Sequence, residues 1–305
     1  MSRPQSAEEA ERAAVTELPP APEPLSVSVV DAHTHLDACG ATDRAGVLAA
    51  LERAGAVGVA AVVTVADDLA SARWVVQAAE WDERVFAAVA LHPTRTGTMT
   101  DADRAELEQL VRQPRVVAVG ETGLDYYWTQ HDPGCAPPEA QREAYRWHID
   151  LAKRVGKPLM IHDRDAHGDV LAVLEQEGPP QTVIFHCFSG DAAMARICVD
   201  AGYVLSFSGT VTFRNARALR EAAVLVPDRQ LLVETDAPFL TPHPHRGKPN
   251  EPVNLPYTVR DLAALRGQDV AELAASTCAN AARLFGFGHP ATKKSFGATD
   301  TVGRF

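Results

Sequence analysis

The sequence of 305 residues has little cysteine and no long hydrophobic run, and each shortage excludes a class of protein. Its five cysteines are odd in number, widely spaced and never arranged as CxxC, which argues against a disulfide scaffold or a zinc ribbon and favours a reducing cytoplasm. The longest apolar run, residues 54–66, contains glycines and ends at Asp67 and Asp68, so it is too short for a membrane span. The first 24 residues lack the apolar core of a signal peptide. We therefore expect no association with a membrane.

Positive charge is also scarce, since 29 Lys and Arg against 40 Asp and Glu give a formal net charge of −11. A chain this acidic is poorly suited to broad, sequence-independent binding of duplex DNA through a basic surface. A nucleic-acid substrate held locally by metal ions and a few arginines is compatible with it. Hydrophobic residues make up 46% of the chain and charged residues 23%, so a large globular core can form.

Between two tails, short apolar runs alternate with helix-like segments. Residues 1–24 and 289–305 are expected to be loose tails, with a short helix near 8–15, and a single domain should span 25–288. Apolar runs predict strands at 27–30, 58–65, 85–91, 116–120, 159–161, 182–185, 203–207 and 231–233. Helices are predicted at 44–54, 70–82, 102–112, 140–155, 169–177, 191–201, 216–224, 258–265 and 270–284. This alternation predicts an α/β fold, a (β/α)8 TIM barrel, with an open doubly wound sheet as the alternative.

Polar side chains that can bind metal follow almost every predicted strand. The carboxyl ends of barrel strands open at one mouth, where such enzymes place their chemistry. His33 and His35 lie two apart on an extended segment and face one side, while Glu121 follows an apolar strand, where a carboxylate needs a cation or hydrogen bonds. Four histidines and two carboxylates are thus predicted at the mouth, enough for two divalent cations: His33, His35, His162, His186, Glu121 and Asp236.

The motifs that contain these residues resemble the TatD family of metal-dependent hydrolases, within the amidohydrolase-like group of (β/α)8 barrels. The resemblance covers about residues 29–287 through DAHTHLD (31–37), LHP (91–93), GETGLDYY (120–127), IHDRDA (161–166), FHCFSG (185–190), SFSGTVTFRNA (206–216), ETDAPFLTP (234–242), RGKPNEP (246–252) and NAARLFG (280–286). The family is described mainly as metal-dependent deoxyribonucleases, some with 3′→5′ exonuclease activity on single strands.

The resemblance implies a role for each residue of the site. One metal would be held by His33, His35, Glu121 and Asp236, and the second by Glu121, His162 and His186, with Glu121 bridging the two. His92 would lie beside the site and touch the substrate, and Glu234 would support the ligands from behind.

The residues favour hydrolysis by a water that two metals activate. Asp236 is the candidate general base, with Glu121 and His92 as further catalytic residues. Mixed imidazole and carboxylate ligands suit Zn²⁺, Mn²⁺ or Fe²⁺ better than Mg²⁺, although the family is usually assayed with Mg²⁺ or Mn²⁺, so the identity of the metals stays open.

Substrate contacts are predicted from the loops that follow the strands. Arg246, Arg164 and Ser208 are candidates for binding phosphate, because a guanidinium group can bind it through two parallel hydrogen bonds. Arg164 could instead pair with a neighbouring aspartate. The aromatic run 126–128 could stack on a base or pack as a lid on the barrel rim.

Two other functions remain open on sequence grounds. The same metals could serve an enzyme that cleaves a small amide, ester or phosphoester, or they could be structural in a non-catalytic scaffold. A polymerase-and-histidinol-phosphatase-type barrel also begins with HxH but normally needs more histidines. We expect a DNA or nucleotide substrate, single-stranded rather than long duplex, and a monomer or small homo-oligomer.

Overall fold

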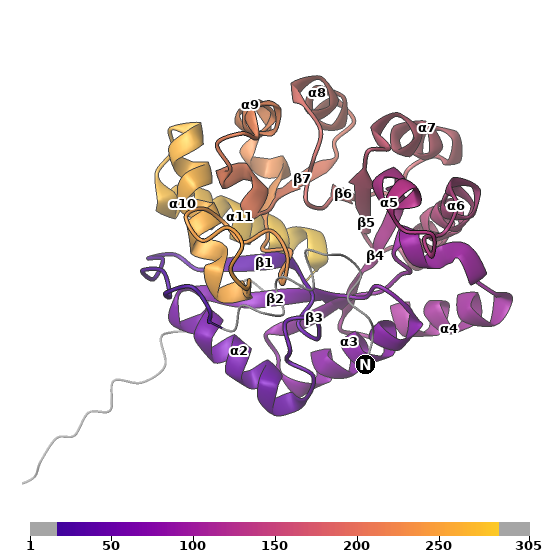
Figure 1. Ribbon diagram of the computed structural model, residues 1–305, viewed down its shortest axis with the longest axis horizontal. Helices are drawn as coiled ribbons and strands as arrows, with labels where there is room; N and C mark the ends of the chain where they lie inside the picture. Colours follow the sequence, from indigo (N-terminus) through magenta and orange to yellow (C-terminus); the bar gives the residue numbers. More distant parts are fainter. Residues whose placement is uncertain (1–16, 287–305) are drawn as a thin grey trace, which may run out of the picture.

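Eight parallel strands at the centre of the molecule confirm the predicted (β/α)8 barrel. The structure is a computed structural model that describes residues 17–286 (Figure 1). The strands pair in sequence order: β1 (Val29–Thr34), β2 (Val59–Val65), β3 (Val85–Ala88), β4 (Val116–Asp125), β5 (Leu159–Arg164), β6 (Val183–Phe185), β7 (Val204–Phe207) and β8 (Leu231–Val233). The barrel closes just beyond β1 and β8, where Thr34 bridges to Ala237 and the His35 N–H donates to the Ala237 carbonyl at 2.7 Å.

Helices surround the strands, and many begin at a side chain that satisfies their free N–H groups. They are α2 (Arg44–Ala56), α3 (Leu69–Trp81), α4 (Asp101–Val111), α5 (Tyr126–His131), α6 (Pro138–Val155), α7 (His167–Glu177), α8 (Ala192–Asp200), α9 (Arg217–Leu225), α10 (Leu255–Arg266) and α11 (Val270–Phe285). Short 3₁₀ helices cover η1 (Pro93–Thr98), η2 (Gly209–Thr212), η3 (Asp228–Gln230) and η4 (Pro252–Asn254). Asp68 caps α3 and Thr100 caps α4, each in a reciprocal pair with the third helical residue.

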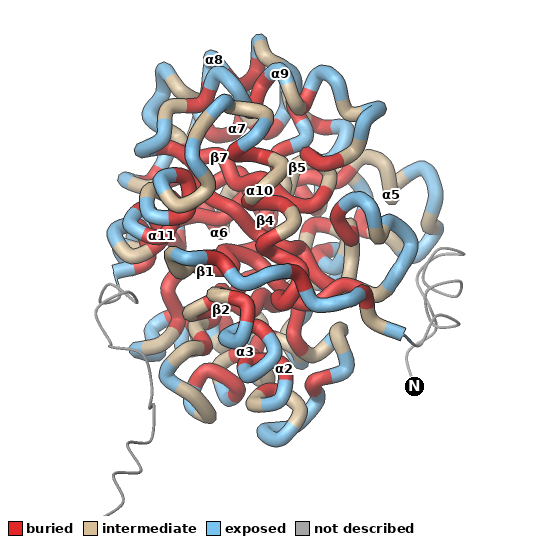
Figure 2. Tube along the Cα trace, turned by 90° about the vertical axis from the view of Figure 1, so that its left-hand side faces the viewer, coloured by how far each residue is buried: buried red, intermediate tan, exposed pale blue. Residues whose placement is uncertain are grey.

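Buried residues concentrate in the strands at the middle of the molecule (Figure 2). The apolar ones form two clusters, one between the strands and the surrounding helices and one inside the barrel. Strand residues such as Val62 face the helices, whereas Val63 and Ile184 point into the barrel. Cys278 and Phe285 of α11 pack with this inner cluster, so α11 contributes to the core within the barrel. The apolar interior leaves the polar chemistry to the strand ends.

Three strands extend further than the sequence pattern predicts. β1, β4 and β5 continue through His33, Glu121 and His162, beyond the ends of the predicted apolar runs. Backbone pairing continues through these polar positions because neighbouring strands satisfy the main-chain groups whatever the side chain. The aromatic run 126–128 lies in the short helix α5.

The N-terminal end of the described chain lies against α10. The Tyr257 hydroxyl donates to the Pro20 carbonyl at 3.0 Å, and the Arg260 guanidinium donates to the Glu23 carbonyl at 2.6 Å. The helix expected near 8–15 and the expected C-terminal tail, 289–305, lie outside the described residues. Within residues 17–286, no helix combines the length and the apolar character needed to cross a membrane.

Candidate metal centre

The structure brings the six predicted ligands together at the carboxyl end of the barrel. They come from β1 and the residue after it, from β4 and β5, and from the segments that follow β6 and β8. All are buried except His162, which is half-buried. Their ligand atoms form overlapping groups in which each atom lies within 4.8 Å of the others.

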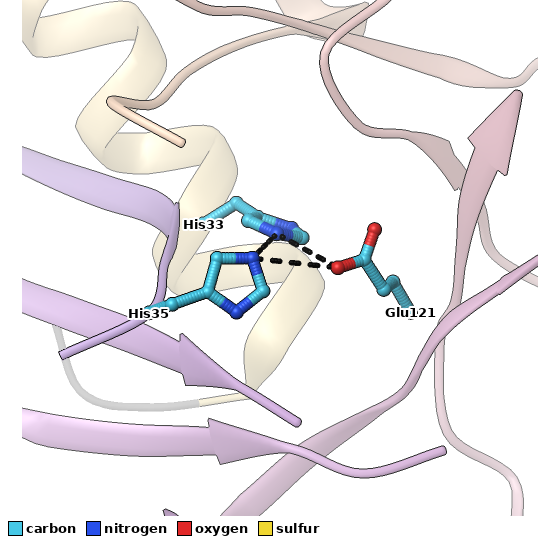
Figure 3. A group of neighbouring side chains, drawn as sticks. All are labelled: His33, His35 and Glu121. Carbon is cyan, nitrogen blue, oxygen red and sulfur yellow. Dashed lines mark hydrogen bonds and ion pairs between the residues drawn. The ribbon is translucent and has the colours of Figure 1, made fainter. Parts of the chain in front are cut away.

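Glu121 occupies the centre of this cluster and faces a histidine pair with each carboxylate oxygen. Oε1 lies 3.6 Å from His33 Nε2 and 3.4 Å from His35 Nε2 (Figure 3). Oε2 lies 2.7 Å from His186 Nε2 and 3.1 Å from His162 Nδ1. Asp236 joins the first pair, because its Oδ1 is 3.6 Å from His33 Nε2 and 3.7 Å from His35 Nε2. One carboxylate therefore separates two sets of nitrogen atoms.

In the first pair, the ring nitrogens that face away from Glu121 lie beside protein acceptors. His35 donates its Nδ1 hydrogen to the Val65 carbonyl at 3.1 Å, and His33 Nδ1 lies 3.2 Å from the Met160 sulfur. A carbonyl can only accept, so His35 Nδ1 carries a hydrogen, and Nε2 is the nitrogen that faces Glu121.

The second pair is oriented by carboxylates. His162 donates its Nε2 hydrogen to Asp125 Oδ2 at 3.0 Å, and His186 Nδ1 lies 3.4 Å from Glu234 Oε1. Acceptors behind each ring are the usual way in which proteins orient histidine ligands of a metal. Asp125 was not predicted from the sequence as a partner of these ligands, although it stands four residues after Glu121 on the same strand.

The charge of the cluster calls for cations. Among the described residues, Glu121 and Asp236 form ion pairs only with histidines and with no lysine or arginine. Burial alone would raise the pKa of Glu121, but the neighbouring His186 and His92 help to bring it well below its usual range. Burial raises the pKa of Asp236 to about 7, against the opposing effect of His186 and His35. Buried carboxylates with imidazole nitrogens directed at them fit divalent metal ions.

A cavity of about 370 Å³ opens onto these residues. His92 lines it, with Nε2 4.0 Å from Glu121 Oε2. Arg164 lines the cavity as well. It forms no ion pair with a neighbouring aspartate; its guanidinium lies over the Tyr127 ring, with Cζ 3.9 Å from the ring centroid. Arg95, from η1, also lines the cavity and was not singled out from the sequence.

The other two residues predicted to bind phosphate do not line this cavity. The Arg246 guanidinium lies over the Phe213 ring at 4.5 Å from its centroid. Ser208 is buried, with Oγ 3.2 Å from Cys187 Sγ and 3.0 Å from Thr210 Oγ1. Of the three residues predicted to bind phosphate, Arg164 is therefore the one that lines the cavity.

Comparison with known proteins agrees with the architecture. Residues 30–286 match the model of a family described as TatD related DNase. The chain is 68% identical over 260 residues to an uncharacterized metal-dependent hydrolase, TatD, of Mycobacterium tuberculosis, covering 85% of this chain and 98% of the relative. It is 33% identical over 251 residues to a protein named 3′-5′ ssDNA/RNA exonuclease TatD from Erwinia tasmaniensis, covering 80% and 94%. The crystal structure of YJJV, a TatD homologue from Escherichia coli K12, superposes with a TM-score of 0.77 at 30% identity, covering 85% and 98%.

Proposed function

The chain belongs to the TatD family of metal-dependent hydrolases, and we propose that it is a deoxyribonuclease that removes nucleotides from the 3′ end of single-stranded DNA. One observation carries the metal-dependent part of the proposal, namely that the two oxygens of Glu121 face two separate histidine pairs. A carboxylate in that position can bridge two cations, as the cleavage of a phosphodiester by two metals requires.

The residues divide the work at the site. His33, His35, Glu121 and Asp236 would hold one divalent cation, and Glu121, His162 and His186 the other. Two bound cations would supply charge that polarises the phosphodiester and lowers the pKa of a water towards about 7.

Two further side chains act on the proton and on the substrate. Asp236 is the proposed general base. Like Glu121 it belongs to the cluster and lines the cavity, but Glu121 already faces both histidine pairs. His92 lines the same cavity beside Glu121 and is placed to touch the substrate. Glu234, buried behind His186, holds that imidazole in place.

Two arginines in the cavity lining support an anionic substrate, although carboxylates line the cavity as well. Arg164 and Arg95 line it, are exposed, and form no ion pair within residues 17–286. A phosphate of the strand is the natural partner for Arg164, because a guanidinium can bind it through two hydrogen bonds.

All five cysteines are free, in keeping with a reducing compartment such as the cytoplasm.

The test uses a single-stranded deoxyoligonucleotide labelled at its 5′ end. Purified protein should shorten it one nucleotide at a time from the 3′ end, a chelator should abolish this, and Mn²⁺ or Mg²⁺ should restore it. The same preparation is offered a panel of small amides, lactones and phosphomonoesters. Chelator-sensitive turnover of a panel compound without any shortening of the strand would disprove the nuclease assignment and leave a metal-dependent hydrolase of another substrate class.

A further inference from the structure

The cavity beside the metal centre contains a second recognition feature, made of an indole and a guanidinium. We infer that Trp128 and Arg164 form a nucleotide subsite in which Trp128 stacks on an unpaired base and Arg164 binds a phosphate of the same nucleotide. The inference rests on the proposed nuclease function and adds the group by which the enzyme recognises its strand.

Position is the first argument for the subsite. Trp128 and Arg164 line the same cavity as Glu121 and His162. Trp128 is half-buried, so part of its ring is available to a ligand, and Arg164 is exposed. A strand whose phosphodiester reaches Glu121 therefore passes these two side chains.

The way in which Arg164 is held is the second argument. Its Cζ lies 3.9 Å from the centroid of the Tyr127 ring and 5.5 Å from that of Trp128. An aromatic face fixes the guanidinium without neutralising it, and no carboxylate within residues 17–286 forms an ion pair with it. Its positive charge is thus free for an anion, directly beside an aromatic ring.

Helix α5 holds Trp128 in a fixed place relative to the metal centre. Asp125 Oδ1 accepts a hydrogen bond from the backbone N–H of Trp128 at 2.8 Å, while Asp125 Oδ2 accepts one from His162 Nε2 at 3.0 Å. On the other side, the Tyr126 hydroxyl donates to Asp169 at 2.6 Å and accepts from Arg142 at 2.7 Å. One carboxylate therefore positions both the aromatic helix and an imidazole that faces Glu121.

This combination matches the chemistry of a nucleotide. A base offers a flat ring to Trp128, and its phosphate, separated from it only by the sugar, offers a negative charge to Arg164. Phe239 and Leu240 add apolar surface to the cavity from the segment after β8. An uncharged aliphatic amide or lactone offers neither a flat ring nor a negative charge.

The experiment compares two single strands with Mn²⁺ present. One is an ordinary deoxyoligonucleotide, and the other has the same length but lacks the bases of its last two 3′ nucleotides. Stacking is typically worth a factor of roughly 5 to 150 per base, so Trp128→Ala should lower kcat/KM by about that factor on the ordinary strand and hardly at all on the abasic one. Arg164→Ala should lower kcat/KM on both strands, since both carry phosphates.

Two variants separate recognition from misfolding. Trp128→Phe keeps an aromatic face and should recover most of the loss. Trp74→Ala is the matched control, because it removes an indole of α3 that packs edge-on against Trp81 at 5.9 Å between ring centroids. Trp74 does not line the cavity, so this variant should leave both rates unchanged.

The outcomes distinguish the subsite from the nuclease function. If Trp128→Ala lowers kcat/KM equally on both strands, or on neither, the subsite is overturned. The nuclease function still stands in that case, provided that the wild-type protein cleaves both strands. If wild-type protein loaded with metal shortens neither strand, the proposed nuclease function fails, and the subsite fails with it.

Discussion

At the scale of single residues, the histidine ring nitrogens that face away from Glu121 set the orientation of the cluster. His35 is held by the Val65 carbonyl and His162 by Asp125, so each directs one nitrogen toward Glu121. These partners orient each ring, so the other nitrogen of His35 and of His162 is presented to Glu121. Partners of this kind typically affect metal affinity or activity by about 10- to 100-fold when they are removed.

Glu121 is the residue whose loss should be most damaging. Glu121→Gln keeps the size of the side chain but removes the charge that faces both histidine pairs, so we expect weaker retention of both metals and a rate at least about a hundredfold lower. Elemental analysis after dialysis gives the metal content, and the 5′-labelled strand gives the rate. Glu106→Gln, on the surface of α4 and paired with Arg73, is the matched control and should behave like wild type. Undiminished metal content and rate in Glu121→Gln would refute its bridging role.

The residues facing Glu121 could be predicted from sequence, but their supporting partners could not. His33, His162 and Asp236 follow apolar runs, which is a visible pattern. The Met160 sulfur and the Val65 carbonyl carry no such pattern, because an ordinary core residue and a main-chain oxygen become partners only through the packing of neighbouring strands.

At the scale of elements, a buried histidine of α6 bonds to chain segments next to the metal centre. His148 is fully buried, accepts from the Leu91 N–H at 3.3 Å and lies 2.9 Å from Thr122 Oγ1 through Nδ1. These partners precede His92 and follow Glu121 in the chain. The helix is thereby tied both to β4 and to the segment that follows β3.

His148 should make the stability of the fold sensitive to acid. Burial lowers its pKa to about 3, so the folded chain keeps it neutral while the unfolded chain takes up a proton below about pH 6.5. Its contribution is fully present above pH 6.5 and is lost as the pH falls toward 3. Between pH 8 and pH 5, wild type should lose about 2 kcal/mol more unfolding free energy than His148→Gln does, measured by urea unfolding.

A control variant keeps the number of titratable groups constant. Leu107→Val in α4 lowers stability by making a small cavity, and its loss between pH 8 and pH 5 should equal that of wild type. Equal losses in wild type and His148→Gln would show that the imidazole does not couple folding to pH in this range.

The lengths of the elements show where sequence patterns stop being informative. The apolar run 116–120 predicted only the first half of β4, because the second half contains polar residues and no longer continues the apolar pattern, although its backbone still pairs with β5. Helix α5 has six residues, fewer than two turns, so no periodic pattern can reveal it. Asp125, the residue before the helix, caps its N-terminus with its side chain.

At the scale of the whole molecule, the barrel could be predicted, whereas the side-chain contacts at its closure could not. Each strand and its following helix are neighbours in sequence, so their alternation is visible. Closure depends on residues about 200 apart: Asp31 accepts from the Thr235 N–H at 2.9 Å and from its hydroxyl at 2.6 Å. Asp31 is fully buried there, and burial raises its pKa to about 8.

The overall charge of −11 leads to a last prediction, on the effect of salt. An acidic molecule does not attract a DNA strand over its whole surface, so the attraction depends on the few cationic groups in the cavity, Arg95 and Arg164. For single strands the logarithm of affinity falls with that of salt concentration by about 0.7 per phosphate neutralised, so two contacts predict a slope of about −1.4.

Measurements of kcat/KM between 50 and 200 mM KCl, with Mn²⁺ held constant, would determine this slope. Arg164→Ala should make it shallower by about 0.7, because one phosphate contact is removed. Arg112→Ala changes the net charge equally but removes a surface arginine of the segment after α4, paired with Glu108, and should leave the slope unaltered. If both variants shift the slope alike, the strand responds to the charge of the whole molecule. If only Arg164→Ala does so, the strand is held locally, at the mouth of the barrel.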